Sequence, residues 1–314
     1  MDGSFTTPAA APRPLGIAAL RKILPPAPFD VAALRGKTVA VDADNLVWSF
    51  VTALAGAGEL PKAPDGRSNA HLLGLLSRLS LYTKWGARSV WVFDGVQPDL
   101  KAATLIERGE RIEAARVAGD NYQASVAVDE DDLEECKRLL THLGMPWIEA
   151  PGESDAQCAQ LVQARHAWAA VTQDWDIALF GAPRALRNLT LSKTRQPEIL
   201  DLGAALATAG LTREQLVDCA ILIGTDYNEG IAGVGPVKAV KLLKQCGNLE
   251  GALARLGAKL PQASEIRALY FAHPVDKRFV PQWKSPDAEA TMDFLRSRGV
   301  PQQRGQDLLN ALDP

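Results

Sequence analysis

Short apolar runs alternate with segments of helical spacing along the first two-thirds of the chain. Five of these runs have the length of buried strands, and they cover residues 38–41, 89–93, 146–149, 167–172 and 177–180. Between most of them, apolar residues recur at intervals of three and four, as in residues 72–81 and 155–162. This alternation predicts an α/β fold with a mostly parallel central sheet flanked by helices.

Beyond residue 210 the pattern is helical throughout. Thr212 and Gln215 have the spacing of a capping box, a glycine-rich turn follows, and helical spacing resumes over residues 238–246. These signals predict a helix-hairpin-helix at about residues 212–246. The chain is therefore expected to divide into a disordered, Pro- and Ala-rich tail over residues 1–14, an α/β core over residues 15–210 and a helical region over residues 211–314.

The composition indicates a protein with a full hydrophobic core, since 47% of its 314 residues are apolar. The longest apolar stretches, such as residues 167–171 and 219–224, are far shorter than the roughly 20 residues that span a bilayer, and the N-terminus lacks a signal pattern. The four cysteines do not pair with histidines as zinc ligands would, so we expect reduced, mostly buried thiols. We expect an intracellular protein with no membrane partner.

Acidic residues stand at the carboxyl ends of the expected strands. One acid ends each of the first, second and fourth strands, another lies two residues after the acid of the fourth strand, and a pair opens the helix after the third. The set is Asp42, Asp94, Asp174, Asp176, Glu153 and Asp155. Ligands of open α/β sheets collect at this edge, where crowded carboxylates repel one another unless cations lie among them. Oxygen ligands of this kind suit Mg²⁺ or Mn²⁺.

A single acid at a strand end often does no more than cap a turn, and Glu153 or Asp155 would also suit the first turn of a helix. Repetition at four strand ends favours the metal site, because caps do not require an acid at each of them. A separate acid run, residues 129–132 with Glu134 and Glu135, is expected to begin a helix and is given no catalytic role.

The glycine-rich turn has features of a phosphate-binding element. Gly233 and Gly235 permit a tight turn and expose backbone N–H groups, which can hold a phosphate together with the N-terminus of the next helix. A cationic stripe at helical spacing follows, formed by Lys238, Lys241 and Lys244. A plain helix-to-helix connection is the alternative. The net charge of −3 argues against a nucleic-acid partner, so local positive charge of this kind must provide the binding.

Together these residues resemble the flap endonuclease family of structure-specific 5′ nucleases over almost all of residues 15–312. The resemblance rests on six blocks in order, which are residues 16–20 (GIAAL), 39–43 (VAVDA), 92–95 (VFDG), 152–156 (GESDA), 172–176 (TQDWD) and 223–227 (IGTDY).

The resemblance implies roles for particular side chains. Metal ions would be bound by seven carboxylates, namely Asp42, Asp94, Glu153, Asp155, Asp174, Asp176 and Asp226, and of these Asp174 is also expected to be catalytic. Lys101 and Arg108 would contact the scissile phosphate. Trp48 would stack on a base, with core packing as the alternative, and Gly16 would lie against DNA. Further DNA contacts are expected from the glycine-rich turn and the lysine stripe, and from Arg187, Lys193 and Arg195. A monovalent cation is a further expected ligand at the turn.

Three features depart from the usual family pattern. A tail of fifteen residues precedes Gly16. The arch, expected within residues 98–128, is short and carries few basic residues beyond Arg111 and Arg116. Its length, like the sequence of residues 145–147, is closer to the Holliday-junction resolvase branch. No clamp-binding motif is seen near Pro314, so no sliding-clamp partner is expected.

These inferences predict a Mg²⁺-dependent, structure-specific 5′ flap endonuclease and 5′–3′ exonuclease of DNA replication, repair or recombination. Its partner would be branched or 5′-ended DNA, hydrolysed in line by two metal ions. A Holliday-junction-resolving endonuclease of the same family is one alternative. A noncatalytic nucleic-acid-binding scaffold and an RNA-cleaving enzyme are two others. The oligomeric state stays open.

Overall fold

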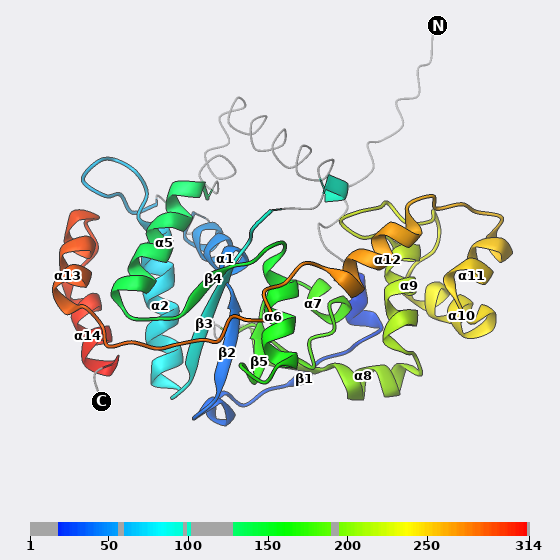
Figure 1. Cartoon of the computed structure of the whole chain (residues 1–314), viewed down its shortest axis with the longest axis horizontal. Coiled ribbons are helices and arrows are strands. Elements are labelled where there is room, and N and C mark those ends of the chain that lie inside the picture. Colours follow the sequence, from blue (N-terminus) through cyan, green and yellow to red (C-terminus); the bar gives the residue numbers. More distant parts are fainter. Residues whose placement is uncertain (1–17, 56–59, 97–98, 102–127, 190–194, 313–314) are drawn as a thin grey trace, which may run out of the picture.

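The computed structural model describes residues 18–55, 60–96, 99–101, 128–189 and 195–312. These residues form a central sheet with helices on both faces and a helical extension at each end of the molecule (Figure 1). No helix in the described ranges is long and apolar enough to cross a bilayer. The predicted tail, most of the predicted arch, and the site candidates Gly16, Arg108 and Lys193 lie outside the described residues.

The sheet has seven strands in the order β1-β7-β6-β5-β2-β3-β4. Their bounds are Ala27–Pro28 (β1), Thr38–Asp42 (β2), Arg88–Phe93 (β3), Trp147–Glu149 (β4), Ala169–Val171 (β5), Arg184–Arg187 (β6) and Glu198–Asp201 (β7). Strands β4, β3, β2, β5 and β6 pair in parallel, whereas β7 is antiparallel to both β6 and β1. The predicted α/β fold with a mostly parallel sheet is confirmed.

One predicted strand is wrong. Residues 177–180 fall in and just after the helix α7, Asp176–Leu179. A four-residue apolar run has too few positions to reveal its period, and an acid in the first helical turn suits a helix as well as a strand end. The strands that follow, β6 and β7, were not predicted, because each carries charged residues at both ends and only two residues between them.

Alternate residues of the strands pack into two hydrophobic cores. On β2, Ala40 belongs to one core, and Val39 and Val41 belong to the other. The helices α1 (Ala43–Ala55), α2 (Ala70–Lys84) and α5 (Glu130–His142) cover the Val39 and Val41 face, and α6 (Ser154–Gln163), α7 and α9 (Arg213–Ile223) cover the other. Because helices cover both faces, a ligand would approach the sheet at the ends of its strands.

The remaining elements are mostly helices. Thr212 and Gln215 form the predicted capping box of α9. The other helices are α8 (Leu202–Ala209), α10 (Pro236–Cys246), α11 (Leu249–Leu256), α12 (Ala263–Ala272), α13 (Ala288–Ser297) and α14 (Gln302–Leu312). The 3₁₀ helices are η1 (Ala18–Lys22), η2 (Val31–Leu34) and η3 (Asp99–Lys101). All four cysteines are free thiols, and three of them are buried, as expected.

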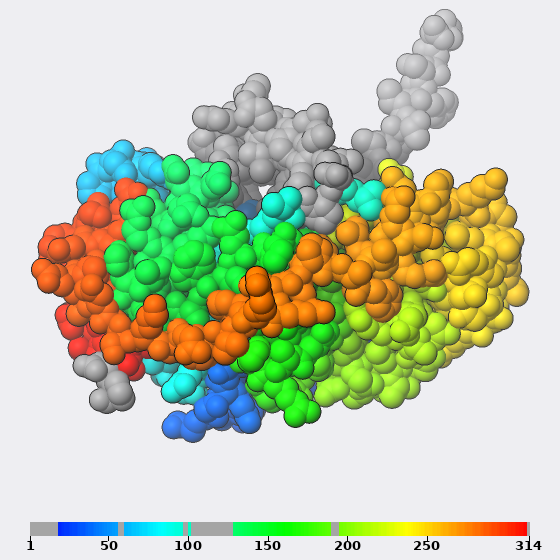
Figure 2. All heavy atoms as spheres, viewed as in Figure 1, coloured from blue at the N-terminus to red at the C-terminus, as the bar shows by residue number. Residues whose placement is uncertain are grey.

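The described helices beyond residue 211 do not gather in one lobe. Helices α9 to α12 lie at one end of the molecule, whereas α13 and α14 pack on α5 and α2 at the other (Figure 1). The intervening strap, residues 273–287, crosses the face of the α/β core (Figure 2). The backbone N–H groups of Lys284 and Asp287 donate to Gly144 O at 2.9 Å and His142 O at 2.7 Å. The strap is therefore fixed to the core near the far end.

Candidate active site

The sheet topology brings the predicted acids to one edge. Asp42 is the last residue of β2, and Asp94 and Asp174 follow β3 and β5. Glu153 is the N-cap of α6, which follows β4, and Asp155 and Asp176 lie in the first turns of α6 and α7. Asp226 follows α9, which belongs to the group of helices α9 to α12. Because β4, β3, β2 and β5 are parallel neighbours, their carboxyl ends meet along one line.

Hydroxyl and backbone donors hold several of these carboxylates. Asp42 accepts from Ser154 Oγ at 3.1 Å and from Thr172 Oγ1 at 2.9 Å. Asp94 Oδ1 accepts from the Ser154 backbone N–H at 2.8 Å. Asp174 Oδ1 accepts from the backbone N–H of the next residue at 2.7 Å. The carboxylates therefore have fixed orientations.

Two other acids each have a carboxylate oxygen without a hydrogen-bond partner in the described structure. Asp155 and Asp176 are buried, and the Oδ1 atom of each has no hydrogen-bond partner among the described residues. Burial, and then the surrounding carboxylates, raises the pKa of both side chains well above the usual range. A buried anion without a partner is unfavourable, so this arrangement suits a cation that would bind these oxygens. The donor set consists of oxygens, which Mg²⁺ and Mn²⁺ prefer.

Lys101 supplies positive charge at this edge. Its Nζ lies 3.3 Å from Glu153 Oε2 and 4.0 Å from Asp226 Oδ2. Burial acts to lower the pKa of this amine, but Glu153 and the neighbouring aspartates outweigh it and raise the pKa. In the described part of the chain, no three acidic, histidine or cysteine side chains converge closely enough to hold an ion as they stand. The carboxylates therefore lie along one edge, but their present positions do not form a coordination sphere for an ion.

One acid of this edge was not predicted. Asp44 Oδ2 accepts from the Asp94 backbone N–H at 2.9 Å. Burial, and then Asp94, raises the pKa of Asp44 to about 7. Asp42-x-Asp44 repeats the acid-x-acid spacing of residues 153–155 and 174–176, and this repetition is the signal that could have revealed it.

Aromatic and imidazole groups from the helical part also reach the carboxylates and were not predicted as site residues. The Tyr227 hydroxyl donates to Glu153 Oε1, and the Tyr270 hydroxyl donates to Asp176 Oδ2 at 3.2 Å. His273 Nε2 accepts from the Glu153 backbone N–H at 2.8 Å. No local pattern marks Tyr270 or His273, because their partners are 94 and 120 residues away along the chain.

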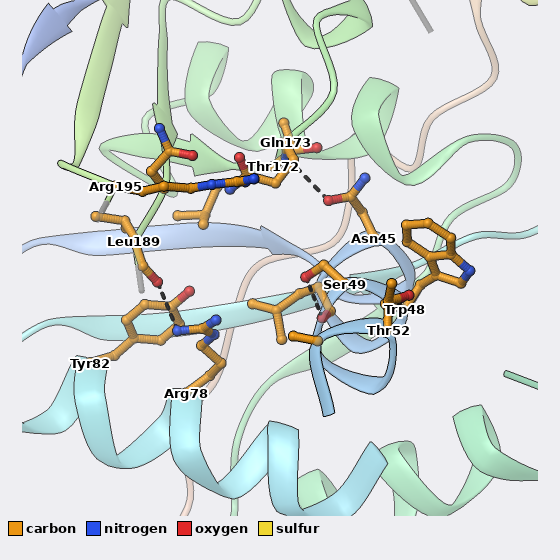
Figure 3. Close-up of a pocket in the computed structure, with 14 residues that line it drawn as sticks. Asn45, Trp48, Ser49, Thr52, Arg78, Tyr82, Thr172, Gln173, Leu189 and Arg195 are labelled. Atoms are coloured by element: carbon orange, nitrogen blue, oxygen red, sulfur yellow. Dashed lines mark hydrogen bonds between the residues drawn. The ribbon is translucent and has the colours of Figure 1, made fainter. Parts of the chain in front are cut away.

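Trp48 lies on α1 beside a hollow of about 640 Å³. Figure 3 shows its ring next to Thr52, while Arg78 of α2 donates to the carbonyl of Leu189 at 3.0 Å. The Trp48 side chain is 40% exposed, so a base could reach its ring. Arg187 is directed inward, with its guanidinium 4.3 Å from the Trp175 ring centre, whereas Arg195 is exposed.

The glycine-rich turn is exposed beside the lysine stripe. Gly233 has a φ of +74°, and an added Cβ would meet no atom within 4 Å at either Gly233 or Gly235. Gly235 is the N-cap of α10. Lys238, Lys241 and Lys244 are exposed along this helix, and Lys238 Nζ donates to Gly233 O at 3.3 Å. The turn and its lysines thus form one accessible surface.

Comparison with known proteins identifies the family. The XPG N-terminal domain matches residues 15–115, and the XPG I-region matches residues 144–226. Flap endonuclease 1 of Methanopyrus kandleri is 37% identical over 310 residues, which cover 90% of this chain and 89% of that protein. The solved flap endonuclease-1 of Methanococcus jannaschii matches with a TM-score of 0.77 at 27% identity, over 93% of this chain and 96% of its own. The catalytic core of Rad2 in complex with DNA substrate matches with a TM-score of 0.76 at 26% identity, over 95% of this chain and 100% of that one. The chain belongs to the flap endonuclease family and is therefore a nuclease, a hydrolase of nucleic acids.

Proposed function

We propose that this protein is a Mg²⁺-dependent endonuclease and 5′–3′ exonuclease that cuts branched or 5′-ended DNA. The observation that carries the proposal is the gathering of seven predicted acids at one edge, where Asp155 and Asp176 each keep a buried oxygen without a partner in the described structure. Membership of the flap endonuclease family supports it. The protein would act in the compartment that holds the cell's DNA, in replication, repair or recombination.

The ligands of the metal ions would come from the seven acids Asp42, Asp94, Glu153, Asp155, Asp174, Asp176 and Asp226. When bound, two divalent cations would activate the attacking water and offset charge on the leaving oxygen. The chain's own part is to hold these oxygens in place. Ser154 and Thr172 fix Asp42, and the backbone at the start of α7 fixes Asp174.

Lys101 would bind the scissile phosphate. Its ammonium already lies between carboxylates of the edge, and a phosphate oxygen that approached the same edge would come within its reach. Arg108 would share this role.

Binding of the DNA would extend over a wider surface. Gly233, Gly235, Lys238 and Lys241 would bind the phosphates of the duplex, with a monovalent cation at the turn, while Trp48 would stack on a base and Gly16 would lie against the strand. The solved Rad2 core, which carries a DNA substrate, supports DNA as the partner.

Cleavage of labelled DNA by the wild type and by Asp174→Ala tests the proposal. The substrates are a 5′ flap, a nicked duplex, a single strand and a four-way junction, each with and without Mg²⁺, beside a matched RNA. We expect Mg²⁺-dependent incision of flap or end-containing DNA, and its loss in Asp174→Ala because a carboxylate of the edge is missing. Preferred incision of the four-way junction would assign the protein to the resolvase branch instead.

Asp131→Ala is the matched control, because Asp131 is an exposed aspartate of the acid run on α5. We expect this variant to cleave like the wild type. Wild-type protein that binds the DNA and cuts none of the substrates in Mg²⁺ or Mn²⁺ would contradict the proposal and favour a noncatalytic scaffold.

A further inference from the structure

The last turn of α12 touches the carboxylate edge at two points. Tyr270 donates its hydroxyl to Asp176 Oδ2 at 3.2 Å, and His273, the C-cap of the helix, accepts from the Glu153 backbone N–H at 2.8 Å. Both residues belong to the end of the molecule that holds helices α9 to α12, and their partners lie at the starts of α7 and α6 in the α/β core. One helix end therefore contacts two of the acids that would bind metal.

Packing fixes both side chains. Tyr270 is 2% exposed, and its ring centre lies 5.2 Å from that of Phe180 and 5.6 Å from that of Tyr227. The His273 ring packs against the same Phe180 at 5.2 Å. Gly152 leaves the room that this imidazole needs, since a Cβ there would come within 2.4 Å of Nε2. These side chains have little freedom to move away from their partners.

The backbone around the two contacts is tied as well. Arg213 of α9 donates through Nη2 to Leu179 O and to Tyr270 O, both at 2.7 Å. Its guanidinium thus joins the end of α7 to α12. A shift of α12 relative to α7 would break these bonds, so the Tyr270 hydroxyl is held at a fixed place beside Asp176.

The contacts leave the metal-binding oxygens available. Tyr270 uses only Oδ2 of Asp176, and Oδ1 stays buried without a partner in the described structure. His273 binds the backbone of Glu153 and leaves the carboxylate to other groups. A partner of this kind orients a ligand without occupying its free oxygen, which is how groups outside the coordination sphere tune metal sites.

We propose that Tyr270 and His273 are positioning residues, which orient Asp176 and Glu153 for metal binding and so connect the helical DNA-binding part to the cleavage site. The inference rests on the proposed function. The two roles of α12 can be tested separately, because packing depends on the two rings, whereas positioning depends on the Tyr270 hydroxyl and the His273 Nε2 atom.

Tyr270→Phe tests the hydroxyl, since the ring and its packing are kept. Mn²⁺ binding to the DNA-free protein is measured by titration calorimetry, beside kcat and KM for a 5′-flap DNA in Mg²⁺. We expect Mn²⁺ affinity and kcat each to fall about 10-fold or more, the range found when a partner of a metal ligand is removed. KM for DNA should stay within about twofold, because Tyr270 is buried and its ring packs on Phe180 and Tyr227.

His273→Gln and His273→Leu test the acceptor as a pair. A glutamine oxygen can replace Nε2 as acceptor for the Glu153 N–H, whereas leucine fills a similar volume without one. We expect His273→Leu to lose Mn²⁺ affinity and kcat, and His273→Gln to recover most of both. Thr291→Val is the control, because it removes a buried hydroxyl that donates at 2.6 Å within α13, at the far end of the molecule. This variant should bind Mn²⁺ and cleave like the wild type.

The outcomes are distinct. If Tyr270→Phe and His273→Leu fold and bind Mn²⁺ as tightly as the wild type, the inference is overturned and the proposed function stands. A glutamine variant that is as impaired as leucine would also overturn it, since an acceptor would then not be what matters. Wild-type protein that neither binds Mn²⁺ nor cuts DNA would overturn the proposed function itself, and the inference with it.

Discussion

The carboxylate edge of the sheet and the first turns of α5 are both rich in acidic residues, but their charges are balanced in different ways. On α5, Arg67 contacts Asp129, Asp131 and Asp132 at 3.0 to 3.3 Å. Asp129 and Asp132 also form a capping box, and Arg298 pairs with the buried Glu135. At the edge, in contrast, Asp155 and Asp176 keep buried oxygens that have no partner in the described part of the chain.

The difference shows that the number of acids in a stretch of sequence does not identify a site. Three of the four acids at residues 129–132 share Arg67 as a partner within the fold. The acids of the edge are spread from residue 42 to residue 226 and leave negative charge for a ligand to balance. Lys101 pairs with Glu153 and Asp226 at the edge, but Asp155 and Asp176 keep buried oxygens without a partner in the described structure. The two regions therefore differ in how many of their carboxylates have a partner, and substitutions in each region should have different consequences.

Asp155→Asn should have the largest effect, and its two consequences should have opposite signs. The amide keeps the shape but removes a charge that repels its neighbours, so we expect the unfolding temperature in chelator to rise by about 2–4 °C, equivalent to about 1 kcal/mol. Cleavage in Mg²⁺ should fall at least about 1,000-fold, because a ligand is weakened. Thermal scans in chelator and flap cleavage check both, and an unfolding temperature below that of the wild type would contradict the account of the edge.

Arg298→Ala should have the next largest effect, on the partnered region. Glu135 is buried, and removal of its arginine breaks a buried ion pair and leaves only the His71 imidazole beside the carboxylate among its described partners, which costs about 3–5 kcal/mol. Urea unfolding measures this loss, and cleavage under folding conditions should be unchanged. Arg67→Ala is the comparison. Its side chain is 38% exposed, so we expect a loss of about 1 kcal/mol. Equal losses in the two variants would mean that burial is not what sets the cost.

A pH dependence at His71 should give the smallest effect. This imidazole lies 3.0 Å from Glu135 and 3.3 Å from Asp132, but arginines already pair with both acids. Burial, and then Arg67 and Arg298, lowers its pKa from 6.5 to about 4. Between these values the unfolded chain binds a proton that the folded chain does not, so stability is full above pH 6.5 and is lost as the pH falls towards 4.

Urea unfolding at pH 7.5 and pH 5 should therefore give a loss of about 2 kcal/mol in the wild type that is absent from His71→Gln. An identical loss in the two proteins would assign the pH dependence to other groups.

Much of the fold could be predicted because its signals are local. The apolar runs that became β2, β3, β4 and β5 are flanked by helices with clear spacing, and Thr212 with Gln215 marked the start of α9. Residues 177–180 could not be assigned in this way, because a run of four apolar residues fits a strand and one helical turn equally well. The crossing of the strap and the docking of α13 on α5 depend on long-range packing, which no local pattern reveals.

The residues of the candidate site also differ in whether a local sequence pattern could reveal them. The acids at the strand ends were recognisable from their repetition, and the structure gathers the described ones at one edge. Their roles as metal ligands stay predictions. Asp44 was missed although its spacing repeats that of the other pairs, and Tyr270 and His273 could not be found because only folding brings α12 to the start of α6 and α7.

The hydrophobic core that contains Val39 and Val41 is completed late in biosynthesis. Phe294, Leu295, Leu308 and Leu309 of α13 and α14 are buried in the same core as Val39 and Val41 of β2. A chain emerging from the ribosome makes β2 early, but this half of the core stays open until residues 288–312 have been translated. A nascent chain that already holds all seven acids would still lack the two helices that close this core.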